Sequence, residues 1–237
     1  MRINKFFTEQ GLCSRREADR LIAEGRVTIN GRVAQLGDQV LPQDLVARDG
    51  TVLQRGNQSV YIKYHKPVGV TTTTESHVRR NIIAEIGHPA RIFPIGRLDK
   101  DSSGLILLTN DGDIVNEILR VEHGHEREYR VELDREFDER FLARMAEGVI
   151  IVGVRTRPCT VVRIGSRRFR ITLTEGRNRQ IRRMCQALGY RVVSLHRVRI
   201  MHILIDGLHA GQWMDLTPQE RRRLFAALGR PVFLRPI

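Results

Sequence analysis

The sequence predicts an α+β protein of two domains: a small α/β module over residues 1–57 and a larger domain over residues 60–237. Hydrophobic residues make up 41% of the 237 residues, which is enough to fill a folded core and excludes a disordered chain. In the larger part, strand-like and helix-like segments follow one another without strict βαβ alternation, which favours a mixed, mostly antiparallel sheet. The polar segment Arg55–Ser59 separates the two parts and is typical of a short linker.

The first domain is expected to contain two helices and a small sheet. A short helix is predicted over Asn4–Gln10, and a second begins after Ser14, which forms a capping-box pattern with Glu17. Around Asn30-Gly31 the chain alternates between apolar and polar residues, which predicts a hairpin. A second turn is predicted at Asp49-Gly50. These elements form a compact module of under sixty residues.

The second domain is rich in strands. Six β-rich segments predict strands at Val60–His65, Glu128–Leu133, Val149–Val154, Thr160–Ile164, Arg168–Leu173 and Arg191–Ile205. The apolar run Ile106–Leu108 predicts one more. Helical patterns occur at Asp113–Arg120, Asp138–Glu147 and Arg177–Leu188. A last helix should begin after Thr217, because a proline occupies the first helical position and a glutamate follows two residues later.

Several classes of protein and site are excluded. The longest apolar runs, such as Leu105–Leu108, are far shorter than the roughly 18–20 residues that cross a membrane, and the amino terminus lacks the apolar core of a signal peptide. The three cysteines are scattered, which predicts neither a disulfide framework nor a zinc site and fits the cytoplasm. His123 and His125 have no third ligand at metal spacing, and phosphate-loop and dinucleotide fingerprints are absent, so no metal or cofactor is predicted.

The positive charge is unevenly distributed along the chain. The formal net charge is +13, which indicates a polyanionic partner, most simply a nucleic acid. Residues 1–58 carry nine basic and seven acidic side chains. In contrast, Arg155–Arg199 contains thirteen arginines and a single acid, Glu175, for a net charge of +12. This stretch passes through several predicted elements, so we expect it to form a basic surface patch when they fold together.

One acidic loop is a candidate for chemistry. Gly96 and Gly104 bracket a loop that carries Arg97, Asp99 and Asp101, and an apolar strand follows it. A carboxylate beside an arginine stays ionised, as a nucleophile or a base requires. The structural alternative is an Asx turn without a catalytic role.

A basic segment is the second candidate. Residues 175–184 place four arginines on just under two predicted helical turns, after a glycine. Ile181, Met184, Cys185 and Leu188 would form the buried stripe of this helix. Arg182 is adjacent in sequence to that stripe, so it could point along the surface toward a cleft and hold a carboxylate in a bidentate pair.

Together these segments resemble the pseudouridine synthases, and the match extends over nearly the whole chain. The resemblance is to the branch acting on ribosomal RNA typified by RsuA, RluB and RluF, and most of all to the RluF type. It is carried by the Gly96–Leu105 loop, Lys66–Val70, Glu126–Val131, Arg177–Met184 and Val193–Ile200. The similarity to RluF rests on His125-Glu126 and on Arg199–Met201.

The first domain is similar to the small RNA-binding module first known from ribosomal small-subunit protein four. Two stretches, Cys13–Ile22 and Gly25–Gly31, carry this resemblance. It implies that Arg15, Arg16 and Arg20 meet RNA phosphates. The alternative is that these charges only solvate the helix.

The resemblance implies a reaction and a role for each site residue. A uridine in RNA would be flipped out of its fold and isomerised to pseudouridine, with neither cofactor nor metal. Asp99 would be the nucleophile, attacking the sugar or the base, although a role as base stays open. Tyr129 would stack on the flipped base, and Arg182 would pair with Asp99. The residues expected to contact the base or the RNA are Arg97, Leu195, Arg177, Arg179 and Arg183.

The expected partner is ribosomal RNA, in first place the large-subunit 23S RNA, with small-subunit ribosomal RNA or transfer RNA as alternatives. We expect a cytoplasmic monomer without a membrane partner. A non-catalytic RNA-binding or ribosome-assembly factor is the competing interpretation, because the first module also occurs in non-enzymes. The Asp99 loop, the Tyr129 strand and the Arg182 helix, in that chain order, argue against it.

Overall fold

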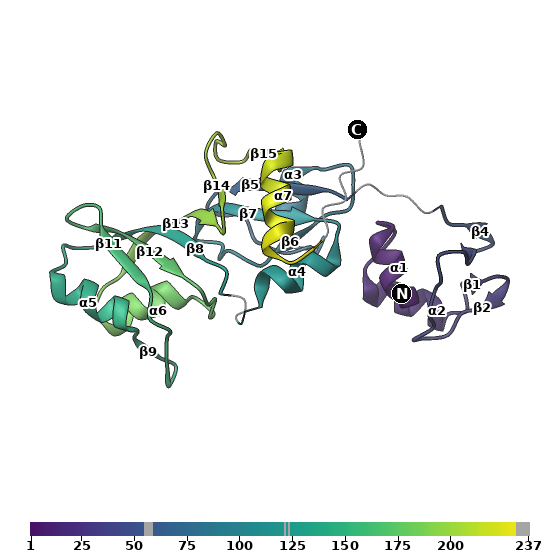
Figure 1. Cartoon of the computed structure of the whole chain (residues 1–237), viewed down its shortest axis with the longest axis horizontal. Coiled ribbons are helices and arrows are strands. Elements are labelled where there is room, and N and C mark those ends of the chain that lie inside the picture. The colour runs from purple at the N-terminus through teal and green to yellow at the C-terminus, as the bar shows by residue number, and fades with distance from the viewer. Residues whose placement is uncertain (55–58, 121, 123, 231–237) are drawn as a thin grey trace. The chain divides into compact units, whose positions relative to one another are not determined.

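The computed structural model describes residues 1–54, 59–120, 122 and 124–230. Of the predicted linker Arg55–Ser59, only Ser59 is among these residues, and His123 also lies outside them. The chain forms two compact units, the first built mainly from residues before Tyr61 and the second mainly from the residues after it. Figure 1 draws both units, with the first in purple to dark blue.

The first unit has two helices and a four-stranded sheet. Its elements are α1 (Ile3–Glu9), α2 (Arg15–Ala23), β1 (Val27–Ile29), β2 (Arg32–Val33), β3 (Val46–Arg48) and β4 (Thr51–Val52), with strand order β2-β1-β3-β4. The Asn30-Gly31 hairpin is confirmed, since β1 and β2 pair with Ile29 opposite Arg32. The capping box is only half formed. Ser14 Oγ accepts from the Glu17 amide, but the Glu17 carboxylate pairs with Arg20 at 2.6 Å.

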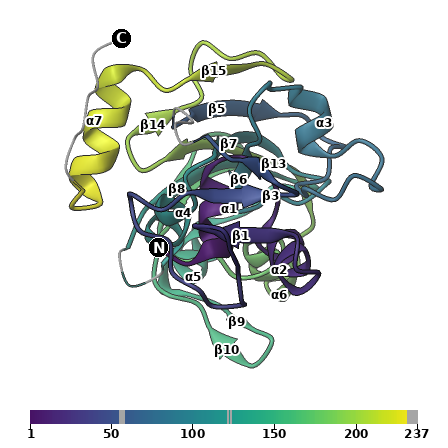
Figure 2. The same cartoon turned by 90° about the vertical axis from the view of Figure 1, so that its right-hand side faces the viewer.

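The second unit is built on one large mixed sheet with the order β11-β12-β8-β13-β7-β5-β15. Its strands are β5 (Tyr61–Lys66), β6 (Phe93–Ile95), β7 (Ser103–Thr109), β8 (Arg127–Leu133), β11 (Thr160–Arg163), β12 (Arg168–Leu173), β13 (Val192–Ile200), β14 (Ile203–Leu204) and β15 (Trp213–Asp215). Strand β13 runs antiparallel to β8 and parallel to β7. The predicted α+β class with a mostly antiparallel sheet is confirmed, and Figure 2 shows β15, β5 and β7 in succession.

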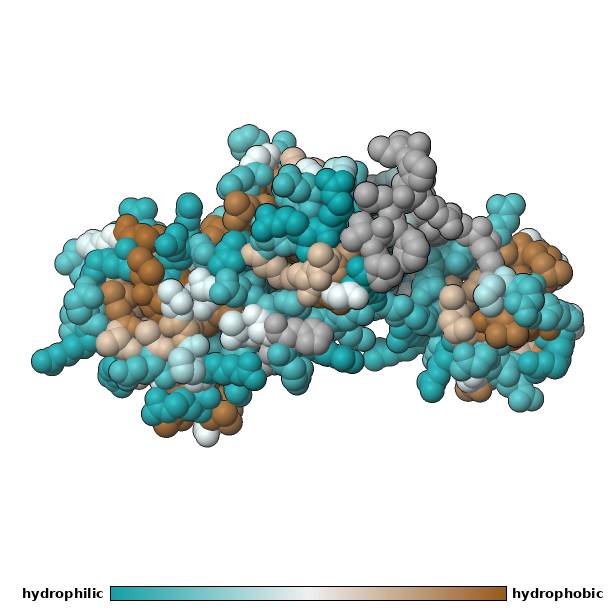
Figure 3. Space-filling view, in the orientation of Figure 1, coloured by the Kyte–Doolittle hydropathy of each residue, from teal (hydrophilic) through white to brown (hydrophobic). Residues whose placement is uncertain are grey.

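In the described part of the second unit, five helices accompany the sheet: α3 (Ile82–Ile86), α4 (Gly112–Leu119), α5 (Glu139–Glu147), α6 (Gln180–Ala187) and α7 (Pro218–Ala227). The predicted cap of α7 is confirmed, because Thr217 and Glu220 form a complete capping box. Helix α7 carries consecutive arginines, and in Figure 3 the surface over it is largely hydrophilic. Helix α3 and strands β6 and β15 were not predicted, since each is five residues or shorter and carries little periodic signal.

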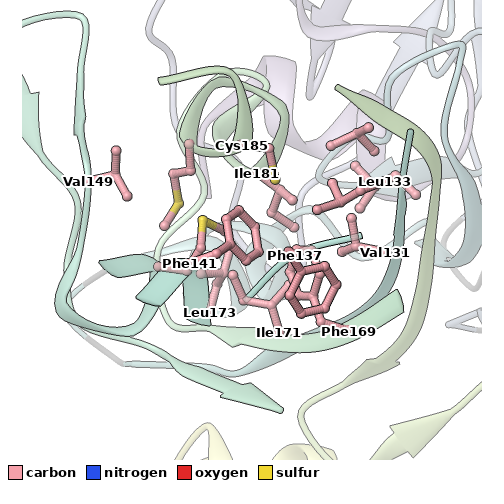
Figure 4. Packing of buried hydrophobic residues seen from close by; sticks show 14 of the residues in the cluster. Val131, Leu133, Phe137, Phe141, Val149, Phe169, Ile171, Leu173, Ile181 and Cys185 are labelled. Atoms are coloured by element: carbon pink, nitrogen blue, oxygen red, sulfur yellow. The ribbon is translucent and has the colours of Figure 1, made fainter. Parts of the chain in front are cut away.

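Two cores lie against the sheet. The larger one brings side chains of β8, β12 and β13 together with those of α5 and α6 (Figure 4). Phe137, Phe141 and Phe169 form its aromatic centre, with ring centroids 5.0–5.7 Å apart. Cys185 is fully buried there, as the helical stripe predicts. The second core joins β7 to α4 and α7, so each half of the sheet has its own helices.

Three predicted elements differ from the structure. The expected strand Val149–Val154 is a hairpin of β9 (Ile150–Ile151) and β10 (Val154–Arg155), because Val152 and Gly153 both take positive φ. The expected strand Arg191–Ile205 turns at Met201, whose φ is 52°, and divides into β13 and β14. The third difference is the start of α6, and it changes the candidate site.

Candidate active site

The acidic loop joins β6 to β7 and is held in place by its two glycines. Gly104 has φ +112° and lies opposite Arg197 on the parallel strand β13. A Cβ at this position would overlap the Arg197 carbonyl oxygen and lie 2.5 Å from the Arg197 nitrogen. Gly96 has φ +80°, and a Cβ there would lie 2.9 Å from Leu119 Cδ2. At Gly104 only glycine therefore lets the loop approach its neighbouring strand this closely, whereas at Gly96 the positive φ is the main reason for glycine.

Helix α6 begins at Gln180, three residues later than the pattern predicts. Glu175, the single acid of the basic stretch, is 4% exposed and organises the segment before the helix. Its carboxylate accepts from Gln180 Nε2 at 2.8 Å, from the Arg157 amide at 3.0 Å and from Arg177 Nε at 3.1 Å. Arg179 takes the left-handed conformation, with φ 51°, as the residue before the first helical turn. A non-glycine residue adopts this conformation only when its surroundings hold it there.

Arg179 connects the basic segment to the acidic loop. Its guanidinium forms a fork with Asp101, with Nη2–Oδ2 at 2.8 Å and Nη1–Oδ1 at 3.1 Å. The same Nη1 lies 3.5 Å from Asp99 Oδ2. The Arg179 fork, together with the nearby Arg182 charge, holds the pKa of Asp101 below its ordinary value, against a partial opposing effect of burial.

The expected ion pair between Arg182 and Asp99 is wrong. Arg182 instead donates through Nη2 to the Asp101 carbonyl at 2.8 Å and to Ser102 Oγ at 3.3 Å, and its Nε lies 3.4 Å from the Asp101 carboxylate. Its Nη1 donates to the Val192 carbonyl at 3.2 Å. The physical reason is the later start of α6: Arg179 lies outside the helix in the left-handed conformation, and from there its guanidinium reaches Asp101 and Asp99. Arg182 thus clamps the loop backbone, and Arg179 is the arginine beside Asp99.

A pocket of about 660 Å³ opens beside this loop. Asp99, Arg97, Tyr129 and Leu195 all line it, whereas Asp101 does not. Arg177 and Arg179 also line it, while Arg182 and Arg183 are outside its lining. Further lining residues are Ile95, Gly96, Leu98, Ser102, Leu119, Arg127, Leu173, Glu175, Gly176, Asn178, Gln180, Ile181 and Arg197. The acidic loop, the strand of Tyr129 and the segment before α6 therefore converge on one cavity.

Two arginines of the pocket were missed by the sequence reasoning. Arg197 is 3% exposed, donates through Nε to the Leu105 carbonyl at 2.6 Å, and places its guanidinium carbon 5.9 Å from the centre of the Tyr129 ring. Its Nη2 is buried without a hydrogen-bond partner among the described residues. Arg127 donates to the Ile118 carbonyl, and burial lowers the pKa of its guanidinium. The available signal was the i, i+2 spacing of Arg197 from Leu195, which puts both side chains on one face of a strand.

The remaining predicted residues lie at the surface. Arg183 donates to Asn178 Oδ1 at 2.8 Å, next to the pocket. In the first unit, Arg15, Arg16 and Arg20 are exposed on α2. Arg20 pairs with Glu17, whereas Arg15 and Arg16 have no ion pair among the residues that the structure describes.

Two kinds of feature are absent from the described part of the chain. It contains no group of three or more His, Cys, Asp or Glu side chains that could hold a metal ion. None of its helices is long and apolar enough to cross a lipid bilayer.

Comparison with known proteins decides the family. The model of the RNA pseudouridylate synthase family matches residues 60–187, and that of the S4 domain matches residues 1–46. The chain belongs to the RNA pseudouridylate synthase family. This synthase is 49% identical over 227 residues to the dual-specificity RNA pseudouridine synthase RluF of Escherichia coli (strain K12), covering 95% of this chain and 78% of the relative.

Two further comparisons support the same family. The ribosomal large subunit pseudouridine synthase B of Bacillus subtilis (strain 168) is 34% identical and is covered over 96% of its length. A crystal structure of a pseudouridylate synthase superposes on this synthase with a TM-score of 0.70 at 30% identity, covering 94% of this chain and 99% of the other. The predicted resemblance to the RsuA, RluB and RluF branch, with an S4 module, is confirmed, as is the activity of an RNA pseudouridine synthase.

Proposed function

We propose that this synthase isomerises a uridine of ribosomal RNA, and that this RNA is that of the large subunit. We also propose that Asp99 is its nucleophile. The target rests on the relatives, one of which is named as a large-subunit enzyme. The assignment of Asp99 rests on one observation: of the two carboxylates in the loop, only Asp99 lines the pocket. The Asp101 carboxylate is held by the Arg179 fork, whereas Asp99 has, among the described residues, one ion-pair contact, at 3.5 Å.

The reaction breaks the bond from the sugar's anomeric carbon to N1 of uracil and joins that carbon to C5. The proton on C5 is lost and N1 gains one, so atoms balance and no electrons leave the base. Asp99 forms a transient covalent bond, either to the anomeric carbon or to the base, and then leaves. Arg179 places its Nη1 3.5 Å from Asp99 Oδ2, so it can help to hold the carboxylate in position for either attack.

The walls of the pocket suit a flipped base. Tyr129 offers an aromatic face and Leu195 an aliphatic one, and both are on strands that line the cavity. Stacking on such side chains offsets the few kcal/mol needed to flip a base out. Arg97 is exposed at the pocket and is placed to steady the RNA beside the flipped nucleotide. Arg177 lines the same cavity, and Arg183 lies next to it, where both can meet RNA phosphates.

The first unit supplies a separate RNA contact in this proposal. Arg15 and Arg16 present free guanidinium groups on α2, so we assign them to phosphates, and Arg20 contributes less because Glu17 already neutralises it. We further propose that the enzyme acts as a monomer in the cytoplasm. In support of the cytoplasm, the three cysteines are free thiols.

A conversion assay tests the function and the nucleophile together. Wild-type protein should convert one uridine of a large-subunit ribosomal RNA transcript, mapped chemically. Asp99→Asn should abolish conversion and leave RNA affinity almost unchanged. Asp101→Asn is the matched control and should retain measurable turnover, because that carboxylate does not line the pocket. Turnover by Asp99→Asn would refute the nucleophile assignment. Pseudouridine maps of total RNA from cells with and without the gene would identify the target.

A further inference from the structure

The face of the sheet that lies opposite the catalytic pocket carries a second groove. Side chains alternate between the two faces of a strand, so neighbours in sequence point in opposite directions. Tyr129 and Leu195 line the catalytic pocket, whereas Arg130 and His196 line a separate groove of about 380 Å³. The full lining of this groove is Arg130, Val131, Glu132, Ile164, Arg168, Arg170, Ser194 and His196. We call it the rear groove.

Basic side chains form a row across three strands of the rear groove. Arg170 on β12 lies directly opposite Arg130 on β8, and Arg130 lies opposite His196 on β13. Arg168 extends the row, since it is two residues from Arg170 on the same face. Like charges directly opposite one another destabilise a sheet. Either a nearby counter-charge or a bound ligand has to offset the repulsion between these arginines.

The carboxylates nearby do not neutralise this row. Glu128 lies 3.7 Å from Arg170 Nε, but it also pairs with Arg199 at 3.1 Å. Glu132 faces Arg168 across the strands and lies 3.8 Å from Arg167 Nη2. Arg130 and Arg168 have no ion pair among the residues described by the structure. Glu126 also lies 2.9 Å from Arg199 Nη1. Three carboxylates thus face five arginines, and the groove keeps an excess of positive charge.

The surroundings of His196 agree with an excess of positive charge in the rear groove. Its Nδ1 lies 2.9 Å from Ser103 Oγ, and its ring centroid is 5.0 Å from that of His65. Burial lowers the pKa of His196 below its ordinary value, and the charges of His65 and Arg130 lower it further. An anion in the groove would relieve both the Arg130–Arg170 repulsion and the field at His196.

We propose that the rear groove binds the phosphodiester backbone of a second RNA segment, distinct from the segment that enters the catalytic pocket. This rests on the proposed action on a large, folded RNA. Guanidinium groups match phosphate geometry and stay charged at all physiological pH values. Arg130, Arg168 and Arg170 are exposed, so a backbone can reach them. Contacts of this kind anchor the RNA without reading its sequence.

The test compares a long RNA with a short one. The long probe is the complete large-subunit ribosomal RNA transcript, and the short probe is a stem-loop that carries the modified uridine. In the double variant Arg130→Gln/Arg170→Gln, the affinity for the transcript should fall about tenfold or more, and the slope of log affinity against log salt should lessen by about two. Affinity for the stem-loop and its conversion should match those of the control.

The control is Arg140→Gln/Arg144→Gln. Both arginines are exposed on α5, which packs against the opposite face through Phe141 and Met145. This control variant removes the same amount of positive charge from elsewhere on the domain. A second variant, Arg130→Lys/Arg170→Lys, should keep most of the affinity, since the charge remains. Unfolding of every variant is followed alongside, and substitution of two repelling arginines should not lower stability.

Three results would overturn the proposal. One is equal weakening by the control double variant, which would mean that only total charge matters. Another is an equal loss of affinity for the transcript in the Gln and Lys variants, which would indicate a structural role of the two arginines. The third is that the Gln double variant loses affinity for ribosomal particles but not for protein-free RNA, which would assign the groove to a protein partner. Conversion of the stem-loop by wild-type protein tests the proposed function separately, so failure of one idea can be told from failure of the other.

Discussion

Asp99 Oδ2 lies 3.5 Å from Nη1 of Arg179, the residue that immediately precedes helix α6. The same guanidinium forms a fork with Asp101, so one arginine links both carboxylates of the loop. Arg182, one turn further along the chain, holds the loop through the Asp101 carbonyl and Ser102. The two arginines therefore act on different parts of the loop, and their substitutions should have different effects.

Arg179→Met should impair catalysis more than folding. Its side chain is 41% exposed, and an exposed pair contributes about 1 kcal/mol or less to stability. Loss of its charge beside Asp99 should lower the rate of conversion about tenfold or more. Arg182→Met should lower the free energy of unfolding by about 1–3 kcal/mol, because that side chain is 13% exposed and donates to backbone carbonyls. Denaturant unfolding and single-turnover rates give both quantities. A reversed order of the two effects would contradict these roles.

Gly104→Ala should destabilise the second unit strongly. The added Cβ would meet the backbone of Arg197, and the φ of +112° disfavours any side chain, so a loss of about 3 kcal/mol or more is expected. Gly207→Ala is the matched control. Its φ is +78° but nothing lies within 4 Å of the added Cβ, so only the conformational cost of about 1 kcal/mol remains. Equal losses in denaturant unfolding would show that β7 and β13 do not approach as described.

Arg197→Lys should lower turnover while retaining RNA affinity. Lysine keeps a charge near the Leu105 carbonyl but cannot reproduce the planar group beside the Tyr129 ring. A fall in kcat of about tenfold or more is expected, with the free energy of unfolding changed by about 1–3 kcal/mol at most. The readout is kcat, the RNA Kd and unfolding measured on the same preparation. Loss of stability with unchanged kcat in the folded fraction would make Arg197 a purely structural residue.

Asp101 should contribute stability that disappears in acid. The pKa of Asp101 in the folded protein lies below its ordinary value of 3.8, so the unfolded chain binds a proton first as the pH falls. The stabilisation is complete well above pH 3.8 and is lost as the pH falls below that value through the folded-state pKa. The difference in Tm between wild type and Asp101→Asn should therefore shrink between about pH 5 and about pH 3. A difference that stays constant over this range would contradict the Arg179 fork.

Local signals in the sequence were sufficient for much of the fold. The Asn30-Gly31 turn and the Thr217 capping box involve neighbouring residues, so their backbone geometry follows from local chemistry, and both are present. The hairpin at Val152-Gly153 was missed because a β-branched residue rarely takes positive φ, as Val152 does here. Short elements such as α3 and β15 depend on neighbours that are distant in sequence.

The sequence by itself determined the family and the α+β class, because residue types and their order along the chain suffice for these. Only the tertiary structure decided which arginine faces which carboxylate. The start of α6 depends on Glu175, which is buried and bonded to Gln180 and to the distant Arg157 amide. Strand pairing likewise brought Arg197 to the pocket and set Arg130 opposite Arg170. Register between strands is a property of the folded sheet, and no single segment specifies it.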